Sequence, residues 1–597
     1  MQLPKKLFAM LTTPERKQAM WLFGMILSMA LLDMIGVASI MPFMTVLASP
    51  ELVETNIVLK TIYAASVNIG VNTTEEFLFL LGMLVFVLLL LSLAFKALTT
   101  YAQLRFTLMR EYSISKRLVK GYLHQPYSWF LNRHSADLGK TVLSEVSTVI
   151  THGLMPFMNL IAQGAVATAL LTLLILIDPQ LALIVGLTLA TVYTLIFKAT
   201  RGILSRVGVD RLKANQERFT AVGEAFGASK EVKFGGLEQT FINRFSKHAR
   251  AYASRQATAQ VIGQLPRFAL EAITFGGMLL VVLYLMAQSG SFASALPVIA
   301  LYAFAGYRLM PALQQIYIAV TELRFAGPAL DSLYFDLMSL KYQLPGPGQD
   351  SMALKETITL NQIQYSYPSA PQPALKSISL TIPAKSTVGL VGTTGSGKTT
   401  TVDLILGLLD VQEGTLAVDG QVITEHNKRA WQRAIGYVPQ QIYLADDTVA
   451  ANIAFGIQAK DIDQAAVERA AKIANLHDFV VNELPQQYQT TVGERGVRLS
   501  GGQRQRIGIA RALYHTPQVL ILDEATSALD NLTEQAVMEA VHNIGHEITI
   551  ILIAHRLSTV KACDTIFFLE KGLLKGQGTF EQLIRANERF RELAMSS

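Results

Sequence analysis

The sequence predicts an α-helical membrane domain fused to an α/β P-loop domain, and three observations lead to this fold class. Six long apolar spans occupy the first half of the chain. A linker rich in Pro and Gly follows, and beyond it the hydrophobic pattern alternates as in β-strands. A glycine-rich motif then lies between a predicted strand, Thr387–Val391, and a predicted helix, Thr399–Leu409. We therefore expect a membrane domain over residues 1–343, a linker over 344–351 and the α/β domain over 352–597.

The composition agrees with a membrane protein. Of the 597 residues, 51% are hydrophobic and only 16% are charged, whereas about a quarter is usual in soluble domains. The net charge of +6 is small, and we expect no nucleic-acid partner. Cys563 is the single cysteine, which excludes an intrachain disulfide. No small-residue cleavage site follows the first apolar run, so we expect no removable signal peptide.

Each apolar span approaches or exceeds the roughly 20 residues with which a helix crosses a bilayer. The spans run over about Met20–Leu47, Phe77–Leu98, Met155–Ile177, Leu181–Phe197, Phe268–Ala287 and Ala293–Ile318. Only Asp178-Pro179-Gln180 separates the third span from the fourth, which predicts a tight hairpin. A large soluble helical core is the alternative, but six such spans do not arise in one soluble domain.

Charge in the connecting segments predicts the orientation in the cell inner (cytoplasmic) membrane. Lys198–Arg255 holds twelve Lys and Arg, and Arg105–Lys140 is also rich in them, whereas the Ser49–Glu76 loop has only Lys60. By the positive-inside rule, the basic segments, both termini and the α/β domain are cytoplasmic. The basic segments have helical periodicity, so we expect the membrane helices to continue as long cytoplasmic extensions.

Two bends in these extensions are candidate docking surfaces, at Gln125–Asn132 and near Phe234–Glu238. The first carries exposed aromatic residues, which could also pack locally. Between the first two spans, Glu51–Val67 fits a short amphipathic helix and a plain loop about equally well.

The glycine-rich motif fits the P-loop pattern G-x-x-x-x-G-K-[ST] and predicts a nucleoside triphosphate site. Backbone N–H groups and the helix N-terminus would hold phosphate, Lys398 would neutralise it, and Thr399 would place its hydroxyl on Mg²⁺. An ordinary Gly-rich turn is disfavoured by the strand–turn–helix context. The predicted phosphate-binding residues are Gly392, Thr393, Thr394, Gly395, Ser396, Gly397, Lys398, Thr399 and Thr400.

Two further motifs complete this prediction. Val519–Leu522 reads as a buried strand that ends in Asp523, a candidate Mg²⁺ ligand, and in Glu524, a candidate to polarise the attacking water. Ser500, Gly501, Gly502 and Gln503 open a predicted helix over Arg504–Tyr514 and form a second phosphate-binding nest. One nucleotide does not need two nests, so we expect the second nest to face a nucleotide on another subunit.

With these motifs in this order, the whole chain resembles an ATP-binding cassette (ABC) half-transporter of the exporter type. The resemblance implies ATP and Mg²⁺ as cofactors and Glu524, His555 and Lys398 as catalytic residues. Tyr367 would stack on adenine, and Gln440 would sense Mg²⁺. Thr491–Gly496 would contact cytoplasmic loops, and Ser527–Asp530 would form a dimer-interface loop, with Asp530 near the nucleotide. The motifs are complete, which favours a homodimer.

Within that family, short stretches are similar to lipid-linked oligosaccharide flippases: Met41–Phe43, Leu265–Glu271, Tyr307–Pro311 and Pro439–Leu444. The resemblance implies ATP-driven transfer of a polyprenyl-pyrophosphate-linked oligosaccharide, with Lys96, Arg267 and Arg308 as candidate pyrophosphate ligands. For Lys96 and Arg267, snorkelling to the interface is an equally good reading. Two other functions stay open, an exporter of lipids or hydrophobic drugs and a non-transporting ABC ATPase, although six spans argue against the latter.

Overall fold

The computed structural model describes residues 2–596 except 52, 54–56, 69, 72, 290–291, 341–350, 369, 494–495, 525–538, 540–546 and 555–556. For some helical residues, Arg267 among them, only the backbone is described. The chain divides into a helical unit, Met1–Gln125 with Asn132–Tyr342, and an α/β unit, Pro126–Leu131 with Gln343–Ser597. Most of the predicted linker lies outside the described residues.

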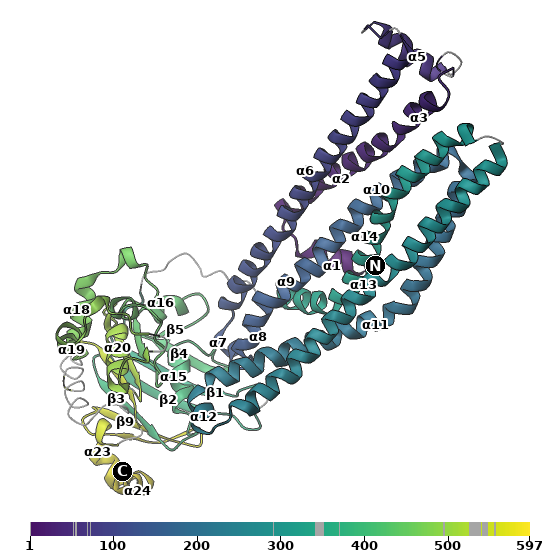
Figure 1. Ribbon diagram of the computed structural model, residues 1–597. Helices are drawn as coiled ribbons and strands as arrows, with labels where there is room; N and C mark the ends of the chain where they lie inside the picture. The colour runs from purple at the N-terminus through teal and green to yellow at the C-terminus, as the bar shows by residue number, and fades with distance from the viewer. Residues whose placement is uncertain are drawn as a thin grey trace. The chain divides into compact units, whose positions relative to one another are not determined.

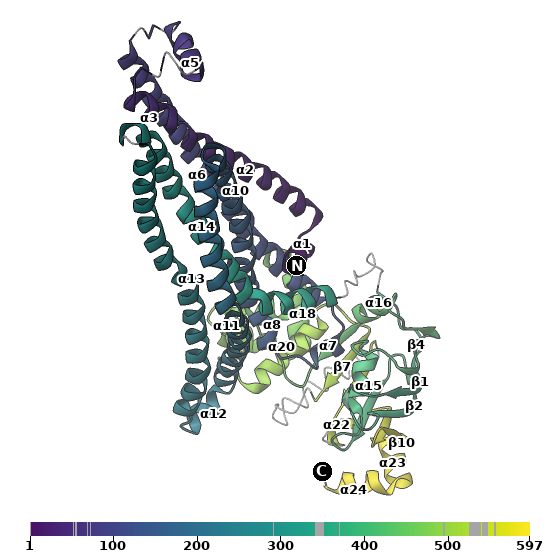
Figure 2. The ribbon, with the colours of Figure 1, turned by 90° about the vertical axis from the view of Figure 1, so that its right-hand side faces the viewer.

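The helical unit is built from a few very long helices and several short ones (Figures 1 and 2). The long helices are α2 (Thr13–Ala38), α6 (Thr74–Leu123), α10 (Met155–Ile177), α11 (Pro179–Gly227), α13 (Glu238–Ser289) and α14 (Phe292–Ser339). The short helices are α1 (Gln2–Met10), α3 (Ile40–Ala48), α5 (Ile57–Val67), α8 (Ser135–Lys140), α9 (Val146–Val149) and α12 (Ser229–Phe234), with π-helical turns at Thr141–Glu145 and Ile150–Leu154.

The first predicted membrane span covers parts of α2 and α3, and each of the other spans lies within a single helix. Among the described residues, four segments are long and apolar enough to cross a membrane: Thr13–Ala48, Thr74–Leu123, Ala136–Ile177 and Ala182–Thr200. The fifth and sixth predicted spans lie in α13 and α14, where many side chains are outside the described residues. The count of six therefore stays a prediction.

The predicted hairpin and the predicted helical extensions are present. Asp178 alone separates α10 from α11, because it leaves the helical region and Pro179 begins the next helix. The helices α6 and α11 run on into the basic segments as single helices of 50 and 49 residues. Of the two readings of Glu51–Val67, the structure shows a helix over its second half, α5. Figures 1 and 2 show α11 and α13 side by side.

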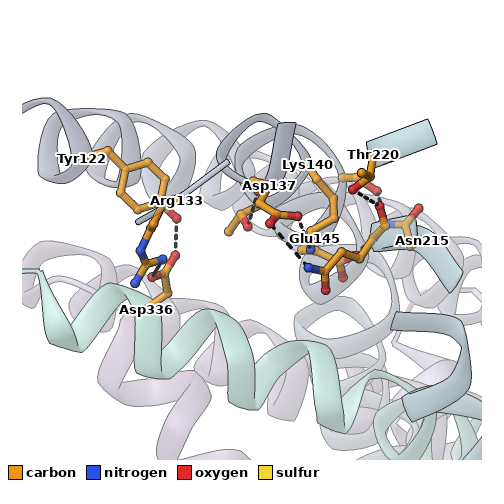
Figure 3. Close-up of polar contacts among 11 residues, drawn as sticks. Tyr122, Arg133, Asp137, Lys140, Glu145, Asn215, Thr220 and Asp336 are labelled. Atoms are coloured by element: carbon orange, nitrogen blue, oxygen red, sulfur yellow. Dashed lines mark hydrogen bonds and ion pairs between the residues drawn. The ribbon is translucent and has the colours of Figure 1, made fainter. Parts of the chain in front are cut away.

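Polar side-chain contacts connect these helices to one another (Figure 3). Tyr122 at the end of α6 and Arg133 after the predicted bend both donate to Asp336 of α14. Glu145 is buried and accepts from Asn215 of α11 at 2.7 Å and from Arg211 of the same helix at 2.9 Å. Because a buried carboxylate needs such partners, this pairing ties the π-helical turn at Thr141–Glu145 to α11.

The α/β unit holds two sheets. An antiparallel sheet has the order β2-β1-β4-β5, and a six-stranded sheet has the order β10-β9-β3-β8-β7-β6, parallel except for β10. The first sheet contains β1 (Thr357–Tyr365), β2 (Leu375–Pro383), β4 (Glu413–Val418) and β5 (Gln421–Val422). The second contains β3 (Thr387–Gly392), β6 (Ile435–Val438), β7 (Val519–Asp523), β8 (Thr549–Ile553), β9 (Thr565–Glu570) and β10 (Leu573–Gly578).

The helices of this unit are mostly short. They are α7 (Tyr127–Phe130), α15 (Lys398–Ile405), α16 (Lys428–Arg433), α17 (Val449–Ile453), α18 (Gln464–Ile473), α19 (His477–Glu483), α20 (Gly501–Leu513), α22 (Leu557–Val560), α23 (Phe580–Ala586) and α24 (Glu588–Ser596), with 3-10 turns at Ala459–Asp461 and Gln487–Gln489. The predicted helix after the P-loop was expected to reach Leu409, and that expectation is wrong. The helix α15 ends at Ile405, because Gly407 turns left-handed at φ 62° and the buried Trp431 indole donates to the Ile405 carbonyl.

Candidate functional site

The P-loop connects the central strand β3 to α15, as its sequence predicts. Gly397 has φ 103°, and a Cβ there would lie 2.6 Å from Leu375 Cδ2. At Gly392 a Cβ would lie 2.1 Å from the Leu569 carbonyl oxygen. Both positions therefore need glycine. The loop residues Thr393, Thr394 and Gly395 are exposed, so their backbone is open to a ligand at the N-terminus of α15.

Lys398 and Ser396 both turn buried polar atoms toward this loop. The Lys398 ammonium donates to the carbonyls of Gly392 at 2.7 Å and Thr393 at 3.1 Å. Burial lowers the pKa of this ammonium, and the nearby carboxylates of Glu524 and Asp523 oppose that shift. The buried Ser396 hydroxyl has no hydrogen-bond partner among the described residues. An anion at the loop would satisfy both groups.

The C-terminal edge of the parallel strands brings the predicted acidic residues and Gln440 together. Asp523 ends β7 and is buried, and Glu524 follows at φ 50° with its N–H bonded to the Ile553 carbonyl of β8. Gln440 follows β6 and donates to Glu524 Oε2 at 2.8 Å. Parallel strands present such residues along one edge, so two separate sequence motifs converge there.

Three residues of this site escaped the sequence reasoning. The Tyr437 hydroxyl lies 3.5 Å from Asp523 Oδ2, and the Gln505 amide donates to the Glu524 carbonyl. Burial raises the pKa of Asp403 on α15 to about 6, and Asp523 adds to the shift. The signal for Tyr437 was its place on β6, three residues before Gln440. Neither Gln505 nor Asp403 belongs to a motif.

Tyr367 lies beside the P-loop helix. Its hydroxyl is 3.1 Å from the Thr400 hydroxyl, and its ring meets that of Tyr365 edge-on at 5.2 Å between centroids. Tyr367 and Thr400, both predicted site residues, are thus brought together. Stacking of Tyr367 on adenine stays a prediction.

The second predicted nest forms the N-terminus of α20, which begins at Gly501 rather than Arg504. Ser500 caps the helix, since its hydroxyl accepts from the Gln503 N–H and its N–H donates to the Gln503 side chain. In the described part of the chain, Ser500–Gln503 form no hydrogen bond with Gly392–Thr400. The role of this nest stays a prediction.

Several predicted residues lie outside the described residues. They are Glu494 and Arg495 of the Thr491–Gly496 motif, the Ser527–Asp530 loop and His555, which follows β8. The first predicted docking bend is described: its α7 segment, Pro126–Leu131, groups with the α/β unit, and the Trp129 and Phe130 rings meet edge-on at 5.1 Å.

The candidate substrate residues Lys96 and Arg308 converge on Asp33, which the sequence reasoning missed. Arg308 of α14 lies 2.8 Å from Asp33 Oδ1, and Lys96 of α6 lies 3.7 Å from Oδ2. The Asp33 side chain is 0% exposed, whereas those of Arg308 and Lys96 are 16% and 35% exposed. A lone Asp in the first apolar span was the available signal, because intramembrane ionisable residues are functional candidates by default. Arg267 is described by its backbone alone.

The chemistry of the residues at the nucleotide site fits the expected ligands, phosphate and Mg²⁺. The unpartnered Ser396 hydroxyl, the buried Lys398 ammonium and the open loop N–H groups suit phosphate oxygens. Mg²⁺ typically takes one or two carboxylates and fills its remaining positions with phosphate and water. The buried Asp523 carboxylate and the exposed Thr399 hydroxyl supply oxygen atoms suited to Mg²⁺.

Comparison with known proteins decides the family. The model of the ABC transporter transmembrane region matches residues 24–315, and the ABC transporter model matches residues 375–527. An ATP-dependent lipid A-core flippase of Cupriavidus pinatubonensis is 33% identical over 78% of this chain and 78% of that protein. This chain belongs to the ABC transporter family. The ABC transporter B family member 29 (chloroplastic) of Arabidopsis thaliana is 32% identical over 74% of the chain and 69% of that protein.

The fold of this ABC transporter also matches that of a solved relative. The structure of a bacterial Atm1-family ABC exporter with ATP bound has a TM-score of 0.77 at 24% identity, over 96% of this chain and 98% of that one. The predicted fold class, a helical membrane domain fused to an α/β ATPase domain, is confirmed. The protein binds ATP, is embedded in a membrane, and couples ATP hydrolysis to transport. The match to the membrane region excludes a non-transporting ABC ATPase.

Proposed function

We propose that this ABC transporter flips an anionic lipid-linked saccharide across the cytoplasmic membrane, with a polyprenyl-pyrophosphate-linked oligosaccharide as the expected substrate. The observation that carries the proposal is the cluster of Lys96 and Arg308 around Asp33. With all three groups charged, two cations face one carboxylate, which leaves a net charge of +1 among apolar helices. Such a charge is costly there, about 2.5–3.5 kcal/mol at the bilayer centre on insertion scales, so an anionic ligand would be stabilised.

The exposure of the cluster supports the same proposal. The two cations are partly exposed while the carboxylate is fully buried, so an approaching ligand meets positive charge. Arginine suits phosphate because its planar guanidinium can donate two parallel hydrogen bonds and stays charged in an apolar setting. The relatives named lipid A-core flippases, including the 33% identical Cupriavidus protein, support a lipid substrate. They do not distinguish a polyprenyl carrier from another anionic lipid.

At the nucleotide site we assign roles to this chain's residues. Lys398 and the loop N–H groups bind the phosphates, and Thr399, Asp523 and Gln440 hold Mg²⁺, which supplies charge neutralisation at the phosphates when bound. Glu524 orients the attacking water, and His555 contacts the γ-phosphate. Gln440, which donates to Glu524 at 2.8 Å, keeps that carboxylate directed along the sheet edge. The Ser500–Gln503 nest and Asp530 complete the site of a second copy, in a homodimer.

The test is the ATPase response of the reconstituted protein to defined lipids. A polyprenyl-pyrophosphate oligosaccharide should raise the rate severalfold and should be flipped in the same proteoliposomes. Glu524→Gln should retain ATP binding but show neither response, since an amide cannot act as the base. Stimulation by a lipid A-core glycolipid but not by the polyprenyl compound would keep the flippase and reject the carrier. Stimulation by neutral hydrophobic compounds alone would reject the anionic substrate.

A second candidate, an exporter of hydrophobic compounds, is favoured by one observation. A cavity of about 410 Å³ lies between α10, α11 and α14, with a mostly apolar lining that includes Leu171, Tyr193, Leu313, Ile316 and Tyr317. The Tyr193 hydroxyl is buried there without a hydrogen-bond partner among the described residues. An apolar ligand with one hydrogen-bonding group would suit this cavity. The lipid series above separates the two candidates.

A further inference from the structure

In the cluster of Asp33, Lys96 and Arg308, Asp33 has the least exposed side chain, and one of its carboxylate oxygens accepts no hydrogen bond from the described residues. Its Oδ1 accepts from the Ser92 hydroxyl and from Arg308, both through hydrogen bonds. Its Oδ2 is buried and has no hydrogen-bond partner among the described residues, with the Lys96 ammonium 3.7 Å away. A buried charge with half of its acceptors unused is costly, so this carboxylate is an incomplete partner for its two cations.

We propose that Asp33 is an internal counter-anion, which holds Arg308 and Lys96 while the transporter is empty and which the anionic group of the substrate displaces during transport. This inference rests on the proposed function and adds a specificity-determining residue to it. Asp33 lowers the charge offered to a ligand from +2 to +1. It therefore weakens substrate binding and, by reclaiming the cations, promotes substrate release.

The packing of α2 against α6 places the carboxylate where it can do this. Gly36 lies one turn beyond Asp33, and a Cβ at Gly36 would be 3.4 Å from Leu89 Cδ2 and 3.9 Å from Ser92 Cβ. These are ordinary contact distances, so α2 and α6 pack closely here, and the Ser92 hydroxyl reaches Asp33. Arg308 arrives from α14. Three helices are thus joined through one carboxylate, and a ligand that takes over its cations would loosen that junction.

The competition has a definite chemical form. The guanidinium of Arg308 carries five N–H donors, and one of them goes to Asp33 Oδ1. The Lys96 ammonium is at 3.7 Å, longer than a hydrogen bond of 2.7–3.2 Å. A phosphate group can therefore contact both cations while the hydrogen bond between Arg308 and Asp33 is still intact. Lys96, as the more exposed and more weakly held cation, is the first contact.

The experiment measures half-stimulating lipid concentration and maximal flipping rate separately. The full-length protein is reconstituted, and ATPase activity is titrated with a polyprenyl-pyrophosphate oligosaccharide. For Asp33→Asn we expect a half-stimulating concentration about tenfold lower than wild type and a reduced maximal flipping rate, because one opposing charge is removed next to the ligand. Asp33→Asn with Lys96→Gln restores the net charge of +1 and should return the concentration toward the wild-type value.

Lys96→Gln alone leaves the Asp33–Arg308 pair intact, so its comparison with the double variant isolates the effect of Asp33 even where Asp33→Asn fails to fold. It should raise the half-stimulating concentration severalfold. Lys116→Gln is the matched control, because Lys116 is an exposed lysine of the same helix whose ammonium contacts Tyr112; it should behave as wild type. If wild type responds to the lipid and the Asp33 and Lys96 variants share its half-stimulating concentration, the counter-anion is refuted alone. If no anionic lipid stimulates wild type, the proposed function fails and the inference with it.

Discussion

Asp403 is a carboxylic acid held where its ionised form is disfavoured. Burial on α15 and the charge of Asp523 raise its pKa to about 6, above the ordinary value of 3.8. A raised carboxyl pKa destabilises the fold once the group is ionised. This cost declines as the pH falls below 6 and is gone below the ordinary pKa of 3.8. Asp403→Asn should therefore raise the thermal midpoint at pH 8 and raise it by clearly less at pH 5.

The expected gain at pH 8 is about 1–2 kcal/mol after allowance for solvent screening of a partly exposed group. It would be measured by thermal unfolding in detergent with EDTA and no nucleotide. Asp410→Asn, which removes an exposed acid that pairs with Lys428, is the control and should show no gain. An equal midpoint shift at both pH values for Asp403→Asn would contradict the assignment.

Site residues in local motifs could be predicted from the sequence, whereas pairs of residues far apart in the chain could not. Gly397 and Lys398 were predictable because strand, turn and helix lie within one short stretch. Asp33 with Arg308 was not, since the two are 275 positions apart and no local pattern relates them. The pairing of Gln440 with Glu524 was not predicted either: the family resemblance gave each residue a role at the nucleotide, and their contact depends on β6 lying next to β7.

At the scale of elements, Asp336 joins the end of α14 to both sides of the first bend. It accepts from Tyr122 at the end of α6 and from Arg133, while the segment between them, Pro126–Leu131, belongs to the α/β unit. The chain thus passes from one unit to the other and back within this bend. Asp336→Asn removes the charge that holds both flanks and should at least halve the lipid stimulation of ATPase activity.

Basal ATPase activity should change little in that variant, because the P-loop and the sheet edge are untouched. Asp331→Asn is the matched control: it lies on the same helix α14 and pairs with Lys6 instead of with the bend. Equal lipid stimulation of Asp336→Asn and wild type, measured in proteoliposomes, would show that the contacts of Asp336 with the bend do not couple lipid binding to ATP hydrolysis.

Element boundaries follow the same division between local and distant causes. The α10–α11 hairpin was predictable because Asp178-Pro179 cannot continue a helix. The early end of α15 was only partly predictable, since Gly407 is a local signal but Trp431 lies 26 residues away. The π-helical turns at Thr141–Glu145 and Ile150–Leu154 carry no Pro or repeat that would signal them, and the buried partner of Glu145 lies on α11.

At the scale of the whole molecule, the sequence predicts two unlike units, and the structure also has two, although Pro126–Leu131 groups with the α/β unit. Apolar length and periodicity were enough for this division, because each unit buries its own core. How two copies would share their nucleotide sites depends on contacts between subunits, which neither the pattern of one chain nor its fold contains. An experiment on mixed dimers addresses this directly.

The composite site predicts that two inactive variants restore each other. Ser500→Arg would obstruct the nest that faces the partner's nucleotide, and Lys398→Ala would disable the P-loop. Each homodimer should lose hydrolysis. A mixed dimer holds one intact site, made of the P-loop of the Ser500→Arg subunit and the nest of the Lys398→Ala subunit, so ATPase activity should return in dimers purified through two different tags.

Ser500→Ala controls for the helix cap, because it removes the capping hydroxyl, worth about 1 kcal/mol, without adding bulk or charge. It should keep more activity than Ser500→Arg, and nucleotide binding by the P-loop should survive in both. If each chain carried a complete site, mixed dimers would stay as inactive as their parents, and hydrolysis by a strictly monomeric preparation would rise in proportion to protein concentration. That result would end the composite-site hypothesis, since Ser500–Gln503 would then act on the nucleotide of their own chain.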